Sequence, residues 1–167
     1  MIKNIVLIGM MGSGKTMIAK SLSGTLKIPL LSTDDMVEKT AGRVIKDIVA
    51  QDGWPRLRQL ENQAVAKAAS AKRAVIDCGG GVVLDSRNMD ILRKSGIIFF
   101  LDAPPDVLYQ RLKNDPSRPL LQVADPPAAL RKIYQERLPL YKQADHVVDA
   151  SDASIQVPVV QILKILK

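Results

Sequence analysis

The eight residues 9–16, Gly-Met-Met-Gly-Ser-Gly-Lys-Thr, constrain this chain more than any other part of it. They match the pattern G-x-x-x-x-G-K-[S/T] in full, between the apolar run 5–8 and a segment with helical apolar spacing. Such a strand–loop–helix unit is typical of open parallel sheets, where the loop binds phosphate at the start of the helix. It predicts an α/β fold and a nucleoside triphosphate site. The alternative is a glycine-rich turn that binds nothing.

The residue types in this loop suit a triphosphate. Glycines let backbone N–H groups turn inward and let phosphate oxygens approach closely. Lys15 supplies positive charge to the β and γ phosphates, and the hydroxyl of Thr16 is a ligand for Mg²⁺. The predicted nucleotide-binding residues of this segment are Gly12, Ser13, Gly14, Lys15, Thr16 and Met17. The loop alone does not distinguish an ATPase, a GTPase and a small-molecule kinase.

Short apolar runs alternate with helical patterns along the rest of the chain. The runs are continuously apolar and each precedes a helical pattern, which indicates a parallel sheet covered by helices on both faces. A chain of 167 residues suits one domain with a sizeable core, so we expect residues 1–167 to form a single domain. The predicted strands are residues 3–8, 28–31, 74–78, 97–101 and 146–148.

Two segments do not fit this alternation. Residues 114–127 contain four prolines, which predicts a long irregular loop. Loops of that length in a compact domain are usually functional or mobile. Residues 51–55, Gln-Asp-Gly-Trp-Pro, predict a turn between two helices.

The net charge of +7 favours an anionic partner. The arginines are scattered over many segments and aromatic residues make up 4% of the chain, so there is little material for base stacking. The balance predicts a polyanionic small molecule and no nucleic acid. The apolar stretches, such as residues 97–101, are far shorter than a membrane span, no basic-apolar leader opens the chain, and the single cysteine fits a reducing compartment. We expect a cytoplasmic protein without membrane contact.

Polar residues follow the predicted strands, where ligands gather in a doubly wound sheet. Ser-Thr-Asp-Asp at residues 32–35 follows the second strand, and residues 79–81, three glycines, follow the third. Arg58 follows the turn at residues 51–55, with Glu61 three residues later, and Arg137 lies near the end of the chain. These residues are the candidates for binding an acceptor.

The segments "GMMGSGKT", "LSTDDMVE", "DGWPRLRQLE", "DCGGGVV", "SRPLL" and "ERLPLY" together resemble shikimate kinase, in the order and near the spacing of that family. The resemblance implies a P-loop kinase fold: one three-layer domain with a five-stranded parallel sheet in the order 2-3-1-4-5, flanked by helices. It implies transfer of the γ-phosphoryl group of ATP, with Mg²⁺, to the 3-hydroxyl of shikimate, a step of aromatic amino-acid biosynthesis.

The resemblance also implies residue roles. Asp34 would hold the hydroxyls of shikimate and act as the base, while Arg58 and Arg137 would hold its carboxylate, since the arginine fork matches carboxylate oxygens. Arg118 would act from a lid over residues 112–127, and Arg111 would lie against the adenine. The implied catalytic residues are Lys15, Asp34 and Arg118, and the implied substrate-binding residues are Asp34, Arg58, Gly79, Gly80, Gly81 and Arg137.

Each role has a simpler alternative. Asp34 could only cap a helix, and Arg58 with Glu61 could be a surface helix pair worth a few tenths of a kcal/mol. The three glycines could form only a tight strand exit. Arg118 could be a solvated loop charge, and Arg137 could cap a helix end.

The sequence departs from the family pattern in three places. Ser32 stands where the family usually has an aspartate near the magnesium; we hypothesise that Asp77 supplies that charge through water, the alternative being a turn or a pair with Arg73. Trp54 replaces a glutamate and Leu57 a phenylalanine, both on the acceptor side, and Trp54 could fill the space that Leu57 leaves.

Two rival functions stay open. One is another P-loop small-molecule kinase, acting on a nucleoside monophosphate or on gluconate, and the other is a nucleotide-binding protein without kinase activity. A carboxylate-bearing acceptor suits two arginines better than a nucleotide does. We expect small-molecule substrates and a monomer.

Overall fold

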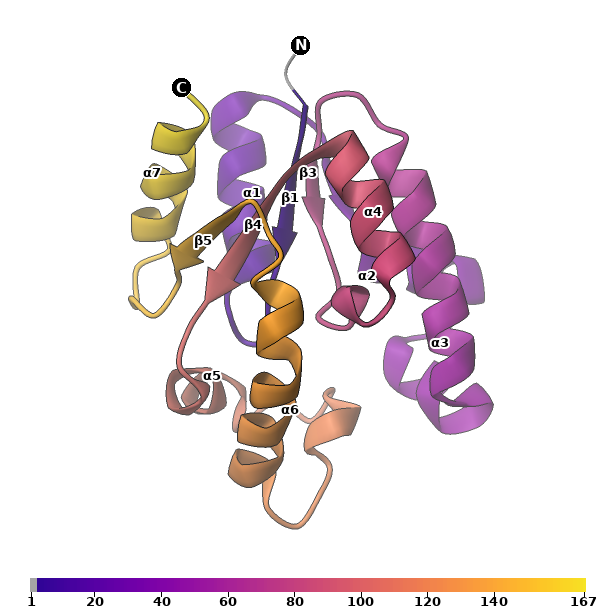
Figure 1. Ribbon diagram of the computed structural model, residues 1–167. Coiled ribbons are helices and arrows are strands. Elements are labelled where there is room, and N and C mark those ends of the chain that lie inside the picture. Colours follow the sequence, from indigo (N-terminus) through magenta and orange to yellow (C-terminus); the bar gives the residue numbers. More distant parts are fainter. Residues whose placement is uncertain (1–2) are drawn as a thin grey trace.

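One parallel sheet forms the middle of three layers in this computed structural model, which describes residues 3–167 (Figure 1). The five strands run in the order β2-β3-β1-β4-β5, each parallel to its neighbours. The predicted fold class and strand order are confirmed. The strands are β1 Asn4–Ile8, β2 Leu30–Ser32, β3 Val75–Asp77, β4 Gly96–Asp102 and β5 His146–Asp149.

The strand bounds differ from the prediction by one or two residues at several ends. The largest shift is in β2, which was expected at residues 28–31 and begins at Leu30. Pro29 precedes it and has no N–H to donate to a sheet, although its carbonyl accepts from Val75 N at 2.8 Å. Apolar pattern alone therefore placed this strand too early.

Strand β1 shows why both faces of the sheet are covered. Ile5 and Leu7 point to one face and Val6 and Ile8 to the other, and all four are buried. The first face packs against α1 and α7, and the second against α3, α4, α5 and α6. The helices are α1 Lys15–Leu26, α2 Thr33–Ala41, α3 Ile45–Ala69, α4 Ser86–Ser95, α5 Pro105–Leu112, α6 Pro126–Tyr141 and α7 Gln156–Ile165, with short 3-10 turns η1 Val82–Leu84 and η2 Pro119–Leu121.

Helix α3 is kinked where the sequence predicts a turn. Gly53 has φ 81° and ψ 171°, a conformation that breaks the helix and suits glycine, and Pro55 follows at the start of the second part. Helix α2 packs on α3 around a third apolar cluster that contains Val37, Ile48 and Leu57. The kink therefore places Trp54 and Leu57, which follow Gly53, beside α2.

The proline-rich segment forms the irregular connection from α5 to α6. It contains only the short turn η2. The expected loop extended to residue 127, but Pro126 and Pro127 lie in the first turn of α6, with the Asp125 side chain accepting from Ala128 N at 3.1 Å. A helix tolerates proline in its first turn because those N–H groups have no partner within the helix.

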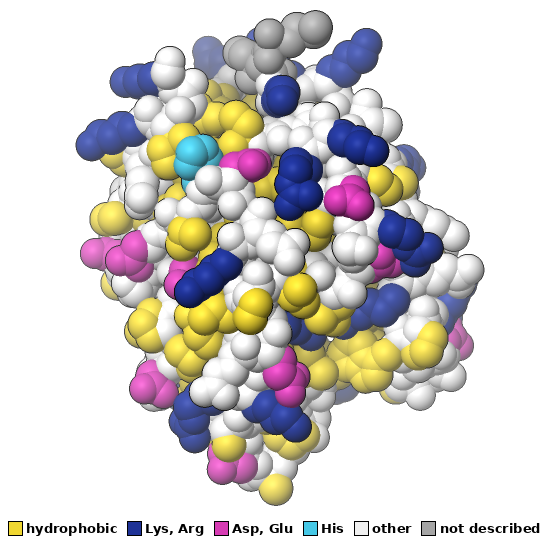
Figure 2. Space-filling view, viewed as in Figure 1, with side chains coloured by type: hydrophobic (Ala, Val, Ile, Leu, Met, Phe, Trp, Pro, Cys, Tyr) yellow, Lys and Arg dark blue, Asp and Glu magenta, His cyan; other side chains and the backbone are white. Residues whose placement is uncertain are grey.

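The surface agrees with the expectation of scattered charge. Figure 2 shows lysine and arginine side chains spread over the face in view, among acidic and apolar ones, without one continuous basic stripe. Within residues 3–167, no helix combines the length and the apolar character that crossing a membrane requires.

Candidate active site

A cavity of about 820 Å³ opens beside the carboxyl ends of β1, β2 and β3. Its walls come from the phosphate loop, α2, α3, the turn after β3, the α5–α6 connection and α6. The predicted site residues that line it are Gly12, Gly14, Lys15, Thr16, Met17, Asp34, Arg58, Asp77, Gly79, Gly80, Gly81, Arg111, Arg118 and Arg137. Ser13 is buried and lines a neighbouring cavity of about 170 Å³, to which Gly14 and Arg111 also contribute.

The phosphate loop has the conformation that its glycines make possible. Gly12 and Gly14 have φ values of 81° and 85°, which residues with a side chain rarely adopt. Lys15 begins α1, and its Nζ donates to the carbonyls of Gly9 and Met10 at 2.9 and 3.0 Å. The ammonium therefore lies across the loop, at the positive end of the helix dipole. Met17, in the first turn of α1, is exposed.

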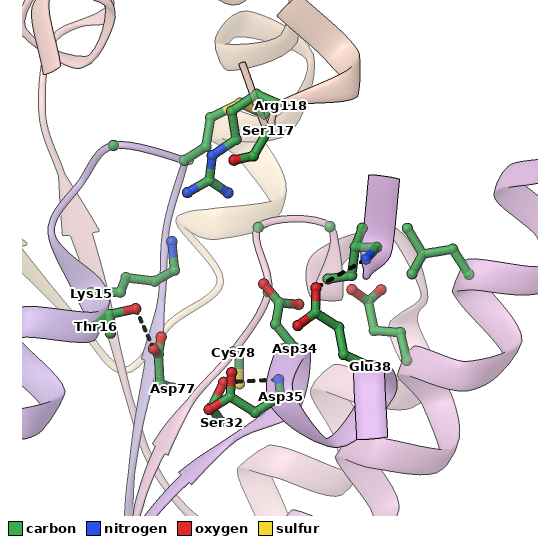
Figure 3. Close-up of a pocket in the computed structure, with 18 of the residues that line it drawn as sticks. Lys15, Thr16, Ser32, Asp34, Asp35, Glu38, Asp77, Cys78, Ser117 and Arg118 are labelled. Atoms are coloured by element: carbon green, nitrogen blue, oxygen red, sulfur yellow. Dashed lines mark hydrogen bonds between the residues drawn. The ribbon is translucent and has the colours of Figure 1, made fainter. Parts of the chain in front are cut away.

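Thr16 and Asp77 form a direct contact at the edge of this loop. Thr16 Oγ1 donates to Asp77 Oδ2 at 2.7 Å (Figure 3). Asp77 ends β3 and is 7% exposed, and its register partner on β2 is Ser32. The alternative pairing of Asp77 with Arg73 is wrong, because the carboxylate points to the phosphate loop. A negative charge therefore stands beside the predicted metal-ligand hydroxyl, one strand away from Ser32.

Ser32 has a structural role of its own. Its side chain accepts from Asp35 N at 3.2 Å and caps the N-terminus of α2, which begins at Thr33. This observation also removes the simpler alternative for Asp34, which is not the cap. Asp34 lies in the first turn and lines the cavity.

Asp34 lies across the cavity from Lys15 (Figure 3). Burial raises the pKa of the Asp34 carboxyl, and the charge of Lys15 opposes this rise. Burial also lowers the pKa of the Lys15 ammonium, against the attraction of Asp77 and Asp34. Asp34 is therefore a stronger proton acceptor than an exposed aspartate.

Arg58 is held on three sides. Its Nη1 donates to Glu61 Oε1 at 3.1 Å, its Cζ lies 5.2 Å from the ring centroid of Trp54, and a Cβ at Gly81 would lie 2.5 Å from that Cζ. Glu61 is 4% exposed, so the interpretation of Arg58 and Glu61 as a surface pair is wrong. Trp54 is partly buried and packs against the third apolar cluster, to which Leu57 belongs.

Arg137 is 7% exposed and lies four residues before the end of α6, so it does not cap that helix. Its Nη1 would lie 3.7 Å from a Cβ at Gly80. Asp34 in turn is the nearest neighbour of Gly79, with its Cγ 3.3 Å from the position of a Cβ there. Each glycine of the turn therefore faces one of the three charged side chains.

The two other predicted arginines differ in their contacts. Arg118 is half-buried, lines the cavity, and pairs with Asp115 at 3.1 Å; Figure 3 shows its guanidinium pointing toward Lys15. Arg111 donates to the carbonyl of Gly12 at 3.2 Å and to three carbonyls in residues 150–152 at 2.9 to 3.2 Å. It joins the phosphate loop to the segment after β5.

Two contacts were missed in the sequence. The N–H of Gly79 donates to Thr33 Oγ1 at 2.9 Å, which fixes the start of the glycine turn against α2. The hydroxyl of Tyr141 donates to the carbonyl of Gly80 at 2.5 Å. Tyr141 follows Arg137 by four residues, a spacing that puts both on one helix face and was the available signal. The sequence carries no comparable signal for Thr33.

A sequence model of the family described as shikimate kinase matches residues 11–167. The chain belongs to the shikimate kinase family. The shikimate kinase of Caldanaerobacter subterraneus subsp. tengcongensis is 44% identical over 92% of this chain and 90% of its own length. That of Thermodesulfovibrio yellowstonii is 40% identical over 97% of this chain and 94% of its own.

Solved structures agree with this family. A shikimate kinase from Acinetobacter baumannii, in complex with shikimate, superposes with a TM-score of 0.95 at 31% identity, covering 99% of this chain and 93% of that one. A gluconokinase from Sinorhizobium meliloti reaches a TM-score of 0.61 at 21% identity, over 98% of this chain and 91% of its own. At that identity the gluconokinase shares the fold alone.

Proposed function

We propose that this protein transfers the γ-phosphoryl group of ATP to the 3-hydroxyl of shikimate, giving shikimate 3-phosphate and ADP. The observation that carries the proposal is the meeting of Asp34, Arg58 and Arg137 on the turn 79–81, opposite Lys15. Family membership supports the same reaction. Gluconate is also a carboxylate with several hydroxyls, so family membership, and not the arginine pair, favours shikimate over it.

The acceptor side suits a small acid with several hydroxyls. Arg58 and Arg137 place two guanidinium groups at one end of the cavity, where they would hold the carboxylate of shikimate. Asp34 would accept hydrogen bonds from the hydroxyls. Gly79 and Gly81 leave room for Asp34 and Arg58, and the turn would bring the backbone close to the acceptor.

The reaction moves one phosphoryl group and one proton. The oxygen of the 3-hydroxyl attacks the γ-phosphorus, the bond from that phosphorus to the β–γ bridging oxygen breaks, and ADP leaves. Asp34, whose pKa is raised by burial, would accept the proton of the hydroxyl. Lys15 and Arg118 would stabilise the charge on the phosphoryl oxygens, which supplies most of the catalysis in this chemistry.

The residues beside the phosphate loop fit Mg²⁺. Thr16 and Asp77 present a hydroxyl and a carboxylate in direct contact, and oxygen ligands with water completing the shell are what this ion prefers. Thr16 would bind it directly and Asp77 through water. When bound, Mg²⁺ neutralises phosphate charge. Asp77 would thereby supply the charge that Ser32 lacks.

The remaining predictions concern the nucleotide and the lid. Arg111 borders the smaller cavity with Gly14 and Ser13, where we place the adenine of ATP. Residues 112–127 would act as a lid that carries Arg118 over the phosphates and excludes water, a competing acceptor. We expect the protein to act as a cytoplasmic monomer on small molecules.

Coupled ADP release tests the proposal. With Mg²⁺ and ATP present, ADP production should depend on shikimate and stay at background with gluconate or nucleoside monophosphates. Stimulation by one of those acceptors alone would support the kinase rival. Tight ATP binding without turnover under any condition would support the nucleotide-binding rival.

A further inference from the structure

Tyr141 is a fully buried residue whose hydroxyl bonds to the glycine turn of the site, and the mechanism above gives it no task. Its ring stacks on Phe100, with centroids 5.0 Å apart and planes at 13°. Its hydroxyl lies 2.5 Å from the carbonyl oxygen of Gly80 and 3.7 Å from the sulfur of Met10. One phenol oxygen therefore touches both the glycine turn and the start of the phosphate loop.

The direction of the bond to Gly80 is fixed by chemistry. A carbonyl only accepts, so the hydroxyl must donate its single proton there. Burial raises the pKa of Tyr141, although the positive charge of Arg137 opposes this rise. The phenol consequently stays protonated at neutral pH and keeps its proton in the bond to the Gly80 carbonyl.

The peptide that Tyr141 holds lies between the phosphate loop and Arg137. A Cβ at Gly80 would lie 3.5 Å from the carbonyl oxygen of Gly9, 3.6 Å from the nitrogen of Met11 and 3.7 Å from Arg137 Nη1. The carbonyl and N–H of a trans peptide point in opposite directions. Holding the Gly80 carbonyl toward α6 therefore orients the N–H of Gly81 away from that helix.

Backbone hydrogen bonds hold the carbonyls of Gly79 and Gly81, which accept from Val82 N at 3.1 Å and Leu84 N at 3.0 Å, whereas the Gly80 carbonyl accepts from Tyr141. Glycines have wide conformational freedom, and residues 79–81 contribute no side chains to packing. The N–H of Gly79 is fixed by Thr33 and the far end of the turn continues into η1. The Gly80 carbonyl is the point between them that Tyr141 fixes.

We propose that Tyr141 is a positioning residue: its hydroxyl holds the Gly80 peptide against the phosphate loop and so sets the position of the acceptor relative to the γ-phosphoryl group. This rests on the proposed shikimate reaction. The simpler explanation is that the phenol only satisfies a buried carbonyl, as buried tyrosines commonly do. Both explanations predict that loss of the hydroxyl lowers the stability of the fold. Only the positioning role predicts a change in the KM for shikimate and in kcat.

The test is Tyr141→Phe, which keeps the ring and its stacking on Phe100. The matched control is Tyr134→Phe: Tyr134 lies on the same helix, but its hydroxyl donates to Asp102 Oδ1 at 2.9 Å and not to a residue of the turn 79–81. We expect Tyr141→Phe to raise the KM for shikimate about tenfold and to lower kcat several-fold, as misplacement of a reactant by a fraction of an ångström does. The KM for ATP should stay within about twofold. Tyr134→Phe should leave all three constants near those of the unchanged protein.

The outcomes separate the two proposals. An unchanged protein that releases no shikimate-dependent ADP would refute the proposed function and, with it, the role of Tyr141. An active protein whose Tyr141→Phe variant keeps its shikimate KM and kcat, at whatever melting temperature, would refute the role of Tyr141 alone. A variant that does not fold would also refute it, because the hydroxyl would then serve the fold and not the acceptor.

Discussion

Adding one methyl group at Gly81 should disable the acceptor site while sparing the nucleotide site. In Gly81→Ala the new Cβ would lie 2.5 Å from Cζ and 2.7 Å from Nη2 of Arg58, with Nη1 closer still. Ordinary contact for a Cβ begins near 3.4 Å, so the guanidinium must move by on the order of 1 Å. The backbone of Gly81, at φ −87° and ψ 1°, does not require glycine.

The magnitude follows from what Arg58 loses. A hydrogen bond between charged partners contributes about 1.5–3 kcal/mol, which corresponds to roughly a 10- to 150-fold change in affinity. We therefore expect the KM for shikimate to rise about 10- to 100-fold. The KM for ATP should change less than about twofold, because the three atoms nearest to the new Cβ all belong to Arg58 and none to the phosphate loop. The fold should survive, since the displaced atoms are the end of a flexible side chain.

Coupled ADP release, with each substrate varied in turn, measures both constants. Gly24→Ala is the control, because a Cβ at this exposed position of α1 meets nothing within 4 Å. It should leave both KM values unchanged and stabilise the protein by roughly 0.8–1 kcal/mol, since alanine favours helix over glycine. The reasoning fails if Gly81→Ala keeps its shikimate KM within twofold of the unchanged protein, or if both KM values rise together.

Four further predictions test other parts of the site and fold. Trp54→Leu should raise the KM for shikimate several-fold by removing a cation–π contact of about 0.5–2 kcal/mol, whereas Trp54→Phe should raise it less; equal effects of the two would contradict this role. Asp77→Asn should raise the Mg²⁺ concentration needed for half-maximal binding of ATP, measured by calorimetry without acceptor, and an unchanged requirement would remove Asp77 from the metal shell. Hydrogen exchange in residues 113–125 should slow when ATP and shikimate are both present, and equal exchange with and without them would argue against a lid. Hydrogen bonds from Arg87 lower the pKa of Asp85 to about 2, whereas an unfolded aspartate titrates near 3.8, so the Asp85 carboxylate stabilises the folded state above that pH. This contribution disappears as the pH falls from about 3.8 toward 2. Chemical denaturation should therefore show that the free energy of unfolding falls less over this pH range in Asp85→Asn than in the unchanged protein.

The fold was predictable because its strongest signals are local. A full phosphate-loop pattern after an apolar strand fixes the position of β1 and α1, and continuously apolar runs such as residues 97–101 mark buried parallel strands. Boundaries set by hydrogen bonding were less predictable. Proline is the clearest case: β2 begins after Pro29 and not at residue 28, and α6 begins at Pro126, inside the expected loop.

The sequence predicted which residues belong to the site better than it predicted the contacts between them. Asp34, Arg58 and Arg137 stand out as charged residues after strands or in family segments, so their shared cavity was expected. The burial of Glu61 was not, because an i, i+3 pair looks the same on a surface helix and in a core. The cap at Ser32 was not predicted, because serine and aspartate both cap helices and the sequence does not show which of residues 32 and 34 precedes the first turn.

The three glycines explain why these distant segments can meet at all. Asp34, Arg58 and Arg137 come from α2, α3 and α6; Asp34 and Arg58 lie tightly against Gly79 and Gly81, and Arg137 lies near Gly80. A Cβ at Gly79 or Gly81 would occupy space that Asp34 or Arg58 needs, whereas a Cβ at Gly80 would be in ordinary contact with its neighbours. The same closeness transmits any shift of the turn to all three, which is why the orientation of one peptide, held by Tyr141, matters for the acceptor as a whole.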